Sequence, residues 1–163
     1  MQTKTLIMNK ALVTLLMPLV ALSCGDKRSA EDEIAGQCVG KFAEAYFNYN
    51  LPEALKYCTA DSRKWIRFAA SNISDSELDT LRARTDRAKV EIMEIKRDGN
   101  NNGGTAVVKV SDFMSYGEIG RPHTIVPQAW CELAFVVEDG KCLVRMEGLP
   151  QNGMSGRAPG PDE

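Results

Sequence analysis

Residues 42–57 read Phe-Ala-Glu-Ala-Tyr-Phe-Asn-Tyr-Asn-Leu-Pro-Glu-Ala-Leu-Lys-Tyr, and they contain the end of one predicted helix and the start of another. Before the break, apolar residues recur at helical spacing and predict a helix over residues 30–48, with one apolar face: Ile34, Cys38, Phe42, Ala45, Tyr46 and Tyr49. Asn50-Leu51-Pro52 interrupts this pattern, because proline fits the first turn of a helix but not its interior. The stretch therefore predicts a long helix followed by a short one.

Two further helices are expected before the pattern changes. One lies near residues 61–70 and carries Trp65, Ile66 and Phe68. Ser74-Asp-Ser-Glu77 has the spacing of a capping box, in which serine and glutamate each satisfy a free backbone N–H of the first turn. The sequence therefore predicts that a fourth helix begins at this box.

From Lys89 onward the pattern is that of strands. We expect strands over residues 90–97, 105–113, 123–138 with a bend at Pro127, and 141–147. Residues 98–104 predict a loose hairpin loop, and Asp139-Gly140 is a strong signal for a two-residue hairpin turn. Helices followed by an antiparallel meander predict an α+β fold, in which N-terminal helices pack on one face of a curved antiparallel sheet.

Three local sequences carry a family resemblance. The stretch 42–57, the sequence Thr59-Ala-Asp-Ser62 and the strand end Val137-Glu-Asp-Gly-Lys141 resemble the cystatin-like, nuclear-transport-factor-2-like (NTF2-like) superfamily. Within it, the chain looks most like small lipoproteins of the Bacteroidota with a lumazine-binding-like domain of unknown function. The resemblance covers about residues 31–148 and implies a cone-shaped fold that can hold a pocket.

The first residues resemble a lipoprotein signal peptide. Residues 11–22 are apolar except for Thr14, a run of about 12 residues that suits a secretory signal and is too short to span a bilayer. Ala21-Leu-Ser-Cys24 resembles a lipobox, which implies cleavage before Cys24 and acylation of its thiol. The alternative is an ordinary signal peptide that leaves Cys24 free, and translation could start at Met1 or Met8.

These boundaries define the expected organisation. Residues 1–23 form the signal peptide, 24–29 a lipidated tether, 30–149 one α+β domain, and 150–163 a flexible tail rich in glycine and proline. The full chain has a net charge of −2, and removal of a signal peptide with two lysines and no acid leaves about −4. Such a charge does not favour nucleic-acid binding.

Four cysteines remain in the expected domain: Cys38, Cys58, Cys131 and Cys142. With a two-residue turn at Asp139-Gly140, Cys131 and Cys142 would lie roughly 20 Å apart, whereas a disulfide needs Cα atoms within about 7 Å. Any bridges should therefore join helix to strand, with Cys38 bound to one of Cys131 and Cys142, and Cys58 to the other. Buried free thiols are the alternative. No close Cys-x-x-Cys spacing suggests a metal site, and no cofactor is expected.

The resemblance implies a pocket between the helices and the sheet, in which related ketosteroid isomerases transfer protons with an acid and a tyrosine. The candidate pocket residues here are Tyr46, Tyr49, Trp65, Asp112 and Trp130. Asp112 alternates with Val108 and Val110 and could face inward as a base, with its pKa raised by burial, although it lies at a strand end where solvent is the simpler environment. Filling of the core explains the aromatic residues equally well, and His123 is expected to be a surface residue.

The sequence thus predicts a membrane-anchored envelope lipoprotein, placed in the outer membrane on its periplasmic or surface face. Its domain is expected to bind a small apolar ligand or another envelope protein without catalysis. The alternatives are a pocket enzyme of the ketosteroid-isomerase or dehydratase type that uses Asp112 and Tyr46, and a purely structural domain with a filled core.

Overall fold

The computed structural model describes residues 30–100, 102–115 and 123–150. The predicted signal peptide, the tether with Cys24, most of the predicted loop at 114–122 and nearly all of the predicted tail lie outside these residues. Among the helices of the described ranges, none is both long and apolar enough to cross a bilayer.

From residue 30, where the described part of the chain begins, four helices and one short 3-10 turn precede the sheet. They are α1 (Ala30–Phe47), α2 (Leu51–Ala54), the turn η1 (Ala60–Ser62), α3 (Arg63–Ser71) and α4 (Asp75–Ala83). The predicted capping box is present, because Ser74 Oγ accepts from the backbone N–H of Glu77, and the Glu77 side chain accepts from the backbone N–H of Ser74. The helical half of the predicted fold is therefore confirmed, with the 3-10 turn as an added element.

The break between α1 and α2 is set by Tyr49. Its φ of 58° is left-handed, and its N–H donates to the carbonyl oxygen of Tyr46 while Asn50 N–H donates to that of Ala45. Tyr49 thus lies beyond the end of α1. The helical spacing had predicted Tyr49 on the apolar face of this helix, and that prediction is wrong. Ile34 is also misassigned by the spacing, since it is 59% exposed near the start of α1.

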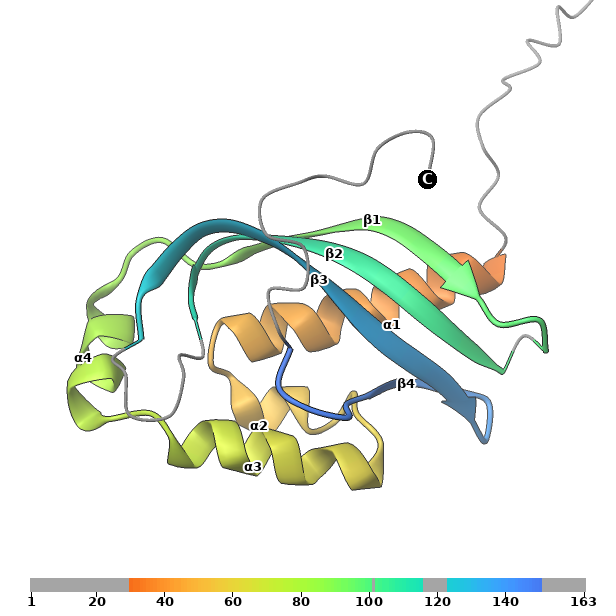
Figure 1. The fold of residues 1–163 in the computed structure, drawn as a ribbon, viewed down its shortest axis with the longest axis horizontal. Coiled ribbons are helices and arrows are strands. Elements are labelled where there is room, and N and C mark those ends of the chain that lie inside the picture. The colour runs from red at the N-terminus through yellow and green to blue at the C-terminus, as the bar shows by residue number, and fades with distance from the viewer. Residues whose placement is uncertain (1–29, 101, 116–122, 151–163) are drawn as a thin grey trace, which may run out of the picture.

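The four strands form one antiparallel sheet in the order β1-β2-β3-β4: β1 (Lys89–Arg97), β2 (Gly103–Met114), β3 (Ile125–Glu138) and β4 (Lys141–Arg145). Figure 1 shows the sheet curving around α1, with α2 and α3 on the same side and α4 at one end. The α+β fold class, with helices on one face of a curved antiparallel sheet, is confirmed.

The two hairpins differ in how well the sequence predicted them. Asp139 and Gly140 both have positive φ, and Glu138 pairs with Lys141, so the two-residue turn and its register are confirmed. The predicted loop at 98–104 is too long. Gly103 and Gly104 already belong to β2, because Gly103 pairs with Val136 and Gly104 with Arg97.

The far edge of β4 is covered by the segment after α2. Cys58 forms a parallel bridge with Val144; Val144 N–H donates to the Tyr57 carbonyl oxygen, and Thr59 N–H donates to the Val144 carbonyl oxygen. Beyond β4, the N–H of Met146 donates to Ser62 Oγ over 2.7 Å. Ser62 is fully buried, so these bonds fasten the end of the sheet to the helical layer.

Ser62→Ala is expected to lower the free energy of unfolding by about 1–3 kcal/mol, because it leaves the Met146 N–H buried without an acceptor. Urea denaturation of purified protein measures the change. Ser71→Ala is the matched control, since the Ser71 hydroxyl is exposed and donates within its own helix to Phe68. Equal stability of both variants would contradict a structural role for this bond.

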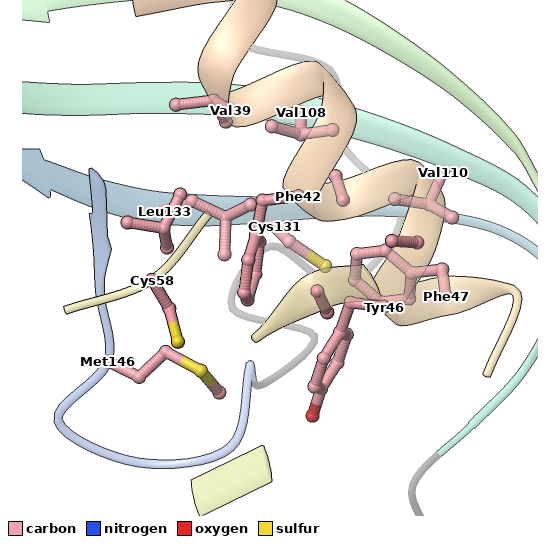
Figure 2. Packing of buried hydrophobic residues seen from close by; sticks show 14 of the residues in the cluster. Val39, Phe42, Tyr46, Phe47, Cys58, Val108, Val110, Cys131, Leu133 and Met146 are labelled. Atoms are coloured by element: carbon pink, nitrogen blue, oxygen red, sulfur yellow. The ribbon is translucent and has the colours of Figure 1, made fainter. Parts of the chain in front are cut away.

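The core lies between α1 and the concave face of the sheet. Figure 2 shows side chains of α1 (Val39, Phe42, Tyr46 and Phe47) gathered against Val108, Val110, Cys131 and Leu133 of the strands. The rings of Phe42 and Tyr46 stack with centroids 5.5 Å apart, and Phe47 meets Phe113 edge-on at 5.2 Å. The predicted space between helices and sheet is therefore a packed core.

Candidate functional site

At the positions where a pocket was expected, the side chains that the structure describes are buried in the core. Phe42 and Phe135 are at most 1% exposed, and Met146 is 7% exposed, all within one cluster of buried side chains. Filling of the interior by these three side chains favours a structural core over an internal ligand site. The functional surface must therefore be sought on the outside of the domain.

The structure places the five candidate pocket residues on different elements of the fold. Tyr46 is fully buried between Phe42 and Phe47, and Tyr49 lies beyond the end of α1. Trp65 is a half-buried residue of α3 that packs against the core, with Lys64 Nζ 5.4 Å from its ring centroid. The fourth aromatic candidate, Trp130, belongs to the opposite sheet face, because neighbouring strand residues alternate and Cys131 faces the core.

Asp112 does not continue the inward series of Val108 and Val110. Its φ of 57° is left-handed, and across the sheet it lies opposite Pro127, between the pairs Ser111–Gln128 and Phe113–Val126. This reversal places Phe113 in the core instead, at 2% exposure. The Asp112 carbonyl oxygen accepts a bond of 2.6 Å from the Arg84 guanidinium. Phe113 therefore takes the core position that alternation along β2 had predicted for Asp112.

His123 has a specific partner that the sequence did not reveal. Its backbone N–H donates to Glu77 Oε1 over 2.8 Å, and its Nδ1 lies 2.6 Å from the same oxygen. Both side chains are largely buried, at 5% exposure for His123 and 14% for Glu77. Glu77 also holds Ser74, so one carboxylate joins the start of α4 to the residues before β3. The capping box identified Glu77, but only the tertiary fold brings it to His123.

Glu77→Gln is expected to destabilise the domain by about 1–3 kcal/mol at neutral pH, because charged hydrogen bonds are lost while a glutamine can still serve the capping box. The backbone N–H of His123, followed by the bonds from Ser74, lowers the Glu77 pKa from 4.5 to about 2. Since the folded pKa lies below the unfolded one, this stabilisation is present above pH 4.5 and disappears as the pH falls toward 2.

Urea denaturation at a series of pH values measures this effect, as the difference in unfolding free energy between wild type and Glu77→Gln. We expect the difference to shrink on acidification. Asp79→Asn is the control, because Asp79 is exposed on the same helix and pairs with Arg82 at the surface. A difference that does not change with pH would contradict the assigned role of the Glu77 carboxylate.

The four cysteines of the domain are free thiols with different surroundings. Cys131 pairs with Val108 and Cys142 with Val137, so the predicted separation of the two strand cysteines is confirmed. Cys58 donates to the Leu55 carbonyl oxygen over 3.7 Å, and burial raises the pKa of Cys131 to about 11. Cys38 donates to the carbonyl oxygen of Cys142 over 2.8 Å.

A cleft of about 270 Å³ lies on the outer side of α1, and we name it the helix cleft. Its lining carries both signs of charge and several amide and aromatic groups: Lys41, Glu44, Ala45, Asn48, Asn50, Glu53, Tyr57 and Arg87. Asn48 fixes one wall, since its side chain exchanges hydrogen bonds with the backbone N–H and carbonyl oxygen of Ala88. Such a lining suits polar contacts at a surface rather than burial of an apolar molecule.

A second cleft, of about 160 Å³, lies where the start of α1 meets the β3–β4 turn, and we name it the thiol cleft. It is lined by Glu31, Ile34, Ala35, Arg97, Val137, Gly140 and Cys142. Arg97 is held by Asp32 at 2.9 Å and by Glu31 at 3.5 Å. Within the described ranges, no three histidine, cysteine or acidic side chains are grouped as metal ligands would be.

Comparisons with known proteins add little to this geometry. No protein family matches the sequence, and no curated protein does. A solved structure that is similar to this chain is described as an LEH-like epoxide hydrolase of M. tuberculosis. It is 19% identical, with a TM-score of 0.35, over 72% of this chain and 80% of that one.

Proposed function

We propose that this chain is a lipid-anchored protein of a bacterial envelope, and that its folded domain acts by binding another envelope protein at its surface, without catalysis. The anchor rests on the apolar segment 11–22 and the lipobox-like residues up to Cys24. The surface mode of binding rests on one observation above all, the packed interior around Phe42, Phe135 and Met146. On the local sequences at residues 42–57, 59–62 and 137–141 we propose that the chain belongs with the lipoproteins that carry a lumazine-binding-like domain.

The packed interior also weighs against the other readings. A small apolar ligand would need the volume that these side chains occupy, and proteins seldom leave such volume unfilled beside a close-packed core. An isomerase-type reaction would need an acid and a tyrosine facing one substrate. Tyr46 is enclosed by aromatic rings, and Phe113 takes the inward position next to Asp112.

The helix cleft is the surface we assign to the partner. It is the larger of the two clefts described above, and Lys41, Arg87, Glu44 and Glu53 all belong to its lining. Mixed charges of this kind favour a partner with complementary charged groups, and they contribute to specificity more than to raw affinity. The proposed partner is therefore a protein with a polar, charged binding segment.

The anchor is tested by metabolic labelling with radioactive palmitate, followed by membrane fractionation. The wild type is expected to take up label and to sediment with membranes, and Cys24→Ala to lose both properties. Cys131→Ala serves as the control and should keep them, because this thiol is buried within the domain. If the wild type took up no radioactive palmitate, the proposed lipid anchor would be contradicted.

The binding mode is tested with a photoreactive amino acid placed in the living cell at Glu44 or Arg87, and at Asp79 as an exposed control that does not line the cleft. We expect one cross-linked protein of defined mass from the cleft positions and none from Asp79. Native mass spectrometry of the full chain provides the opposing outcome. A small molecule bound at one per chain would favour ligand binding instead.

A further inference from the structure

Cys38 and Cys142 approach each other at the thiol cleft although they lie 104 positions apart in the sequence. The Cys38 thiol donates to the Cys142 carbonyl oxygen over 2.8 Å, so the two cysteines are in direct contact. Cys142 belongs to the lining of the cleft and is half-buried, whereas Cys38 is only 8% exposed. Cys142 is therefore the more accessible of the two thiols.

We propose that Cys142 and Cys38 form a dithiol site that reacts with small disulfides, with Cys142 as the attacking thiol and Cys38 as the resolving thiol. The site goes beyond the proposed binding function and uses a different surface of the domain. It also selects one pair among the helix-to-strand pairings that the sequence left open.

The surroundings assign the two roles. The pKa of Cys142 is lowered, first by the hydrogen bond from Cys38 and further by the Arg97 guanidinium, and these effects exceed that of burial. The pKa of Cys38 is raised by the same hydrogen bond and by burial. Since the thiolate is the nucleophile, Cys142 attacks first. The side chains of Ile34 and Val137 line the entrance with exposed apolar surface, which suits an uncharged or aromatic disulfide.

The reaction balances as a thiol–disulfide exchange. The Cys142 thiolate attacks one sulfur of R–S–S–R, the S–S bond breaks, and one RS⁻ leaves. In the mixed disulfide the Cys142 sulfur is no longer a thiolate and no longer accepts a hydrogen bond from Cys38. Cys38 then loses its proton to solvent and attacks the Cys142 sulfur. The second RS⁻ leaves, and the two leaving thiolates take up the two protons. The protein dithiol is oxidised by two electrons, and the external disulfide is reduced to two thiols.

The other two thiols lack this arrangement. Cys58 donates to the Leu55 carbonyl oxygen, three residues before it, and Cys131 is 1% exposed in the core, where burial raises its pKa. Neither lines the thiol cleft. They provide matched internal controls for accessibility.

The experiment uses the full chain with Cys24→Ala, purified in detergent, reduced, desalted and then treated with 4,4′-dithiodipyridine. We expect rapid release of two thiopyridone molecules per chain, loss of two hydrogen atoms from the protein mass, and one cross-linked peptide that joins Cys38 to Cys142. The product should melt about 10 °C higher than the reduced protein, because the bridge closes a loop of more than a hundred residues. The Cys131→Ala variant should behave in the same way.

Variants separate the two steps. Cys38→Ser should release one thiopyridone rapidly and keep a thiopyridyl group on Cys142, whereas Cys142→Ser should react at least ten times more slowly than wild type. Circular dichroism confirms that each variant is folded, and Cys38→Ala and Cys142→Ala replace any that is not. A wild type that ends as a stable mixed disulfide, that bridges Cys58 or Cys131, or that does not react rapidly would overturn the proposal.

Discussion

Phe42→Ala is expected to lower the free energy of unfolding by about 3–5 kcal/mol, the usual range for truncating a fully buried phenylalanine. Phe42 is 0% exposed, and its ring stacks on Tyr46 with an interplanar angle of 16°. Truncation removes both this contact and the packing against the sheet. Because the cavity would lie at the centre of the core, the surrounding side chains can close it only in part.

Urea denaturation of the wild type and the variant measures this loss, and Phe68→Ala provides a matched control. Phe68 is 37% exposed on α3, so its truncation should cost less than about 1 kcal/mol. A second readout is binding of benzene, which enters engineered apolar cavities. We expect binding to Phe42→Ala and none to the wild type. Benzene binding by the unmodified chain would show that the interior is not filled and would reopen the internal ligand site.

Gly104→Ala is the second substitution with a large expected effect. A Cβ atom at this position would overlap the carbonyl oxygen of Lys96 and lie 2.9 Å from the Cα of Arg97. Both contacts are with backbone, which cannot move aside as a flexible side chain would. We expect a loss of about 3 kcal/mol or more, because β1 must separate from β2 to accept the methyl group.

Gly99→Ala is the control for this substitution, because a Cβ there has no atom within 4 Å and the residue lies in the same hairpin region. Its stability should stay within about 0.5 kcal/mol of wild type. Thermal unfolding followed by circular dichroism compares the two variants. If Gly104→Ala were as stable as Gly99→Ala, the observed pairing of Gly104 with Arg97 would be wrong.

Much of the fold follows from local chemistry that is visible in the sequence. The Ser74–Glu77 box sets the start of α4, and Asp139-Gly140 sets both the turn and the register of β3 and β4. Pro52 marks the start of a new helix after the break. Each of these signals acts within a few residues, so no knowledge of the tertiary structure is needed to interpret it.

The candidate site depended on longer inferences, and these were less reliable. The prediction from alternation along β2 assumed a regular strand. The left-handed backbone of Asp112 breaks this regularity, so that Phe113 takes the inward position. The aromatic candidates were assigned by residue type, yet Trp130 lies on the opposite face from Cys131. Sequence spacing gives the direction of a side chain only while the backbone stays regular.

The sequence patterns could not predict contacts between residues that are far apart in the sequence. Cys38 was expected to approach Cys131 or Cys142, but the choice depends on how α1 lies across the sheet. In the structure, its thiol is beside Cys142. Likewise the partner of His123 is Glu77, 46 positions earlier. Whether the cone is hollow or filled also depends on the fit of many side chains at once, which no single motif encodes.

The separation between α1 and β4 has a consequence for how the polypeptide acquires its structure during synthesis. Cys142 follows Cys38 by 104 positions, and at about 5–20 residues per second the ribosome needs roughly 5 to 20 s to add them. Throughout this delay the apolar side of α1 has none of its final partners from β4. The core between α1 and the sheet can therefore be completed only after the last strand emerges, and faster elongation shortens the time for which this side of α1 stays exposed.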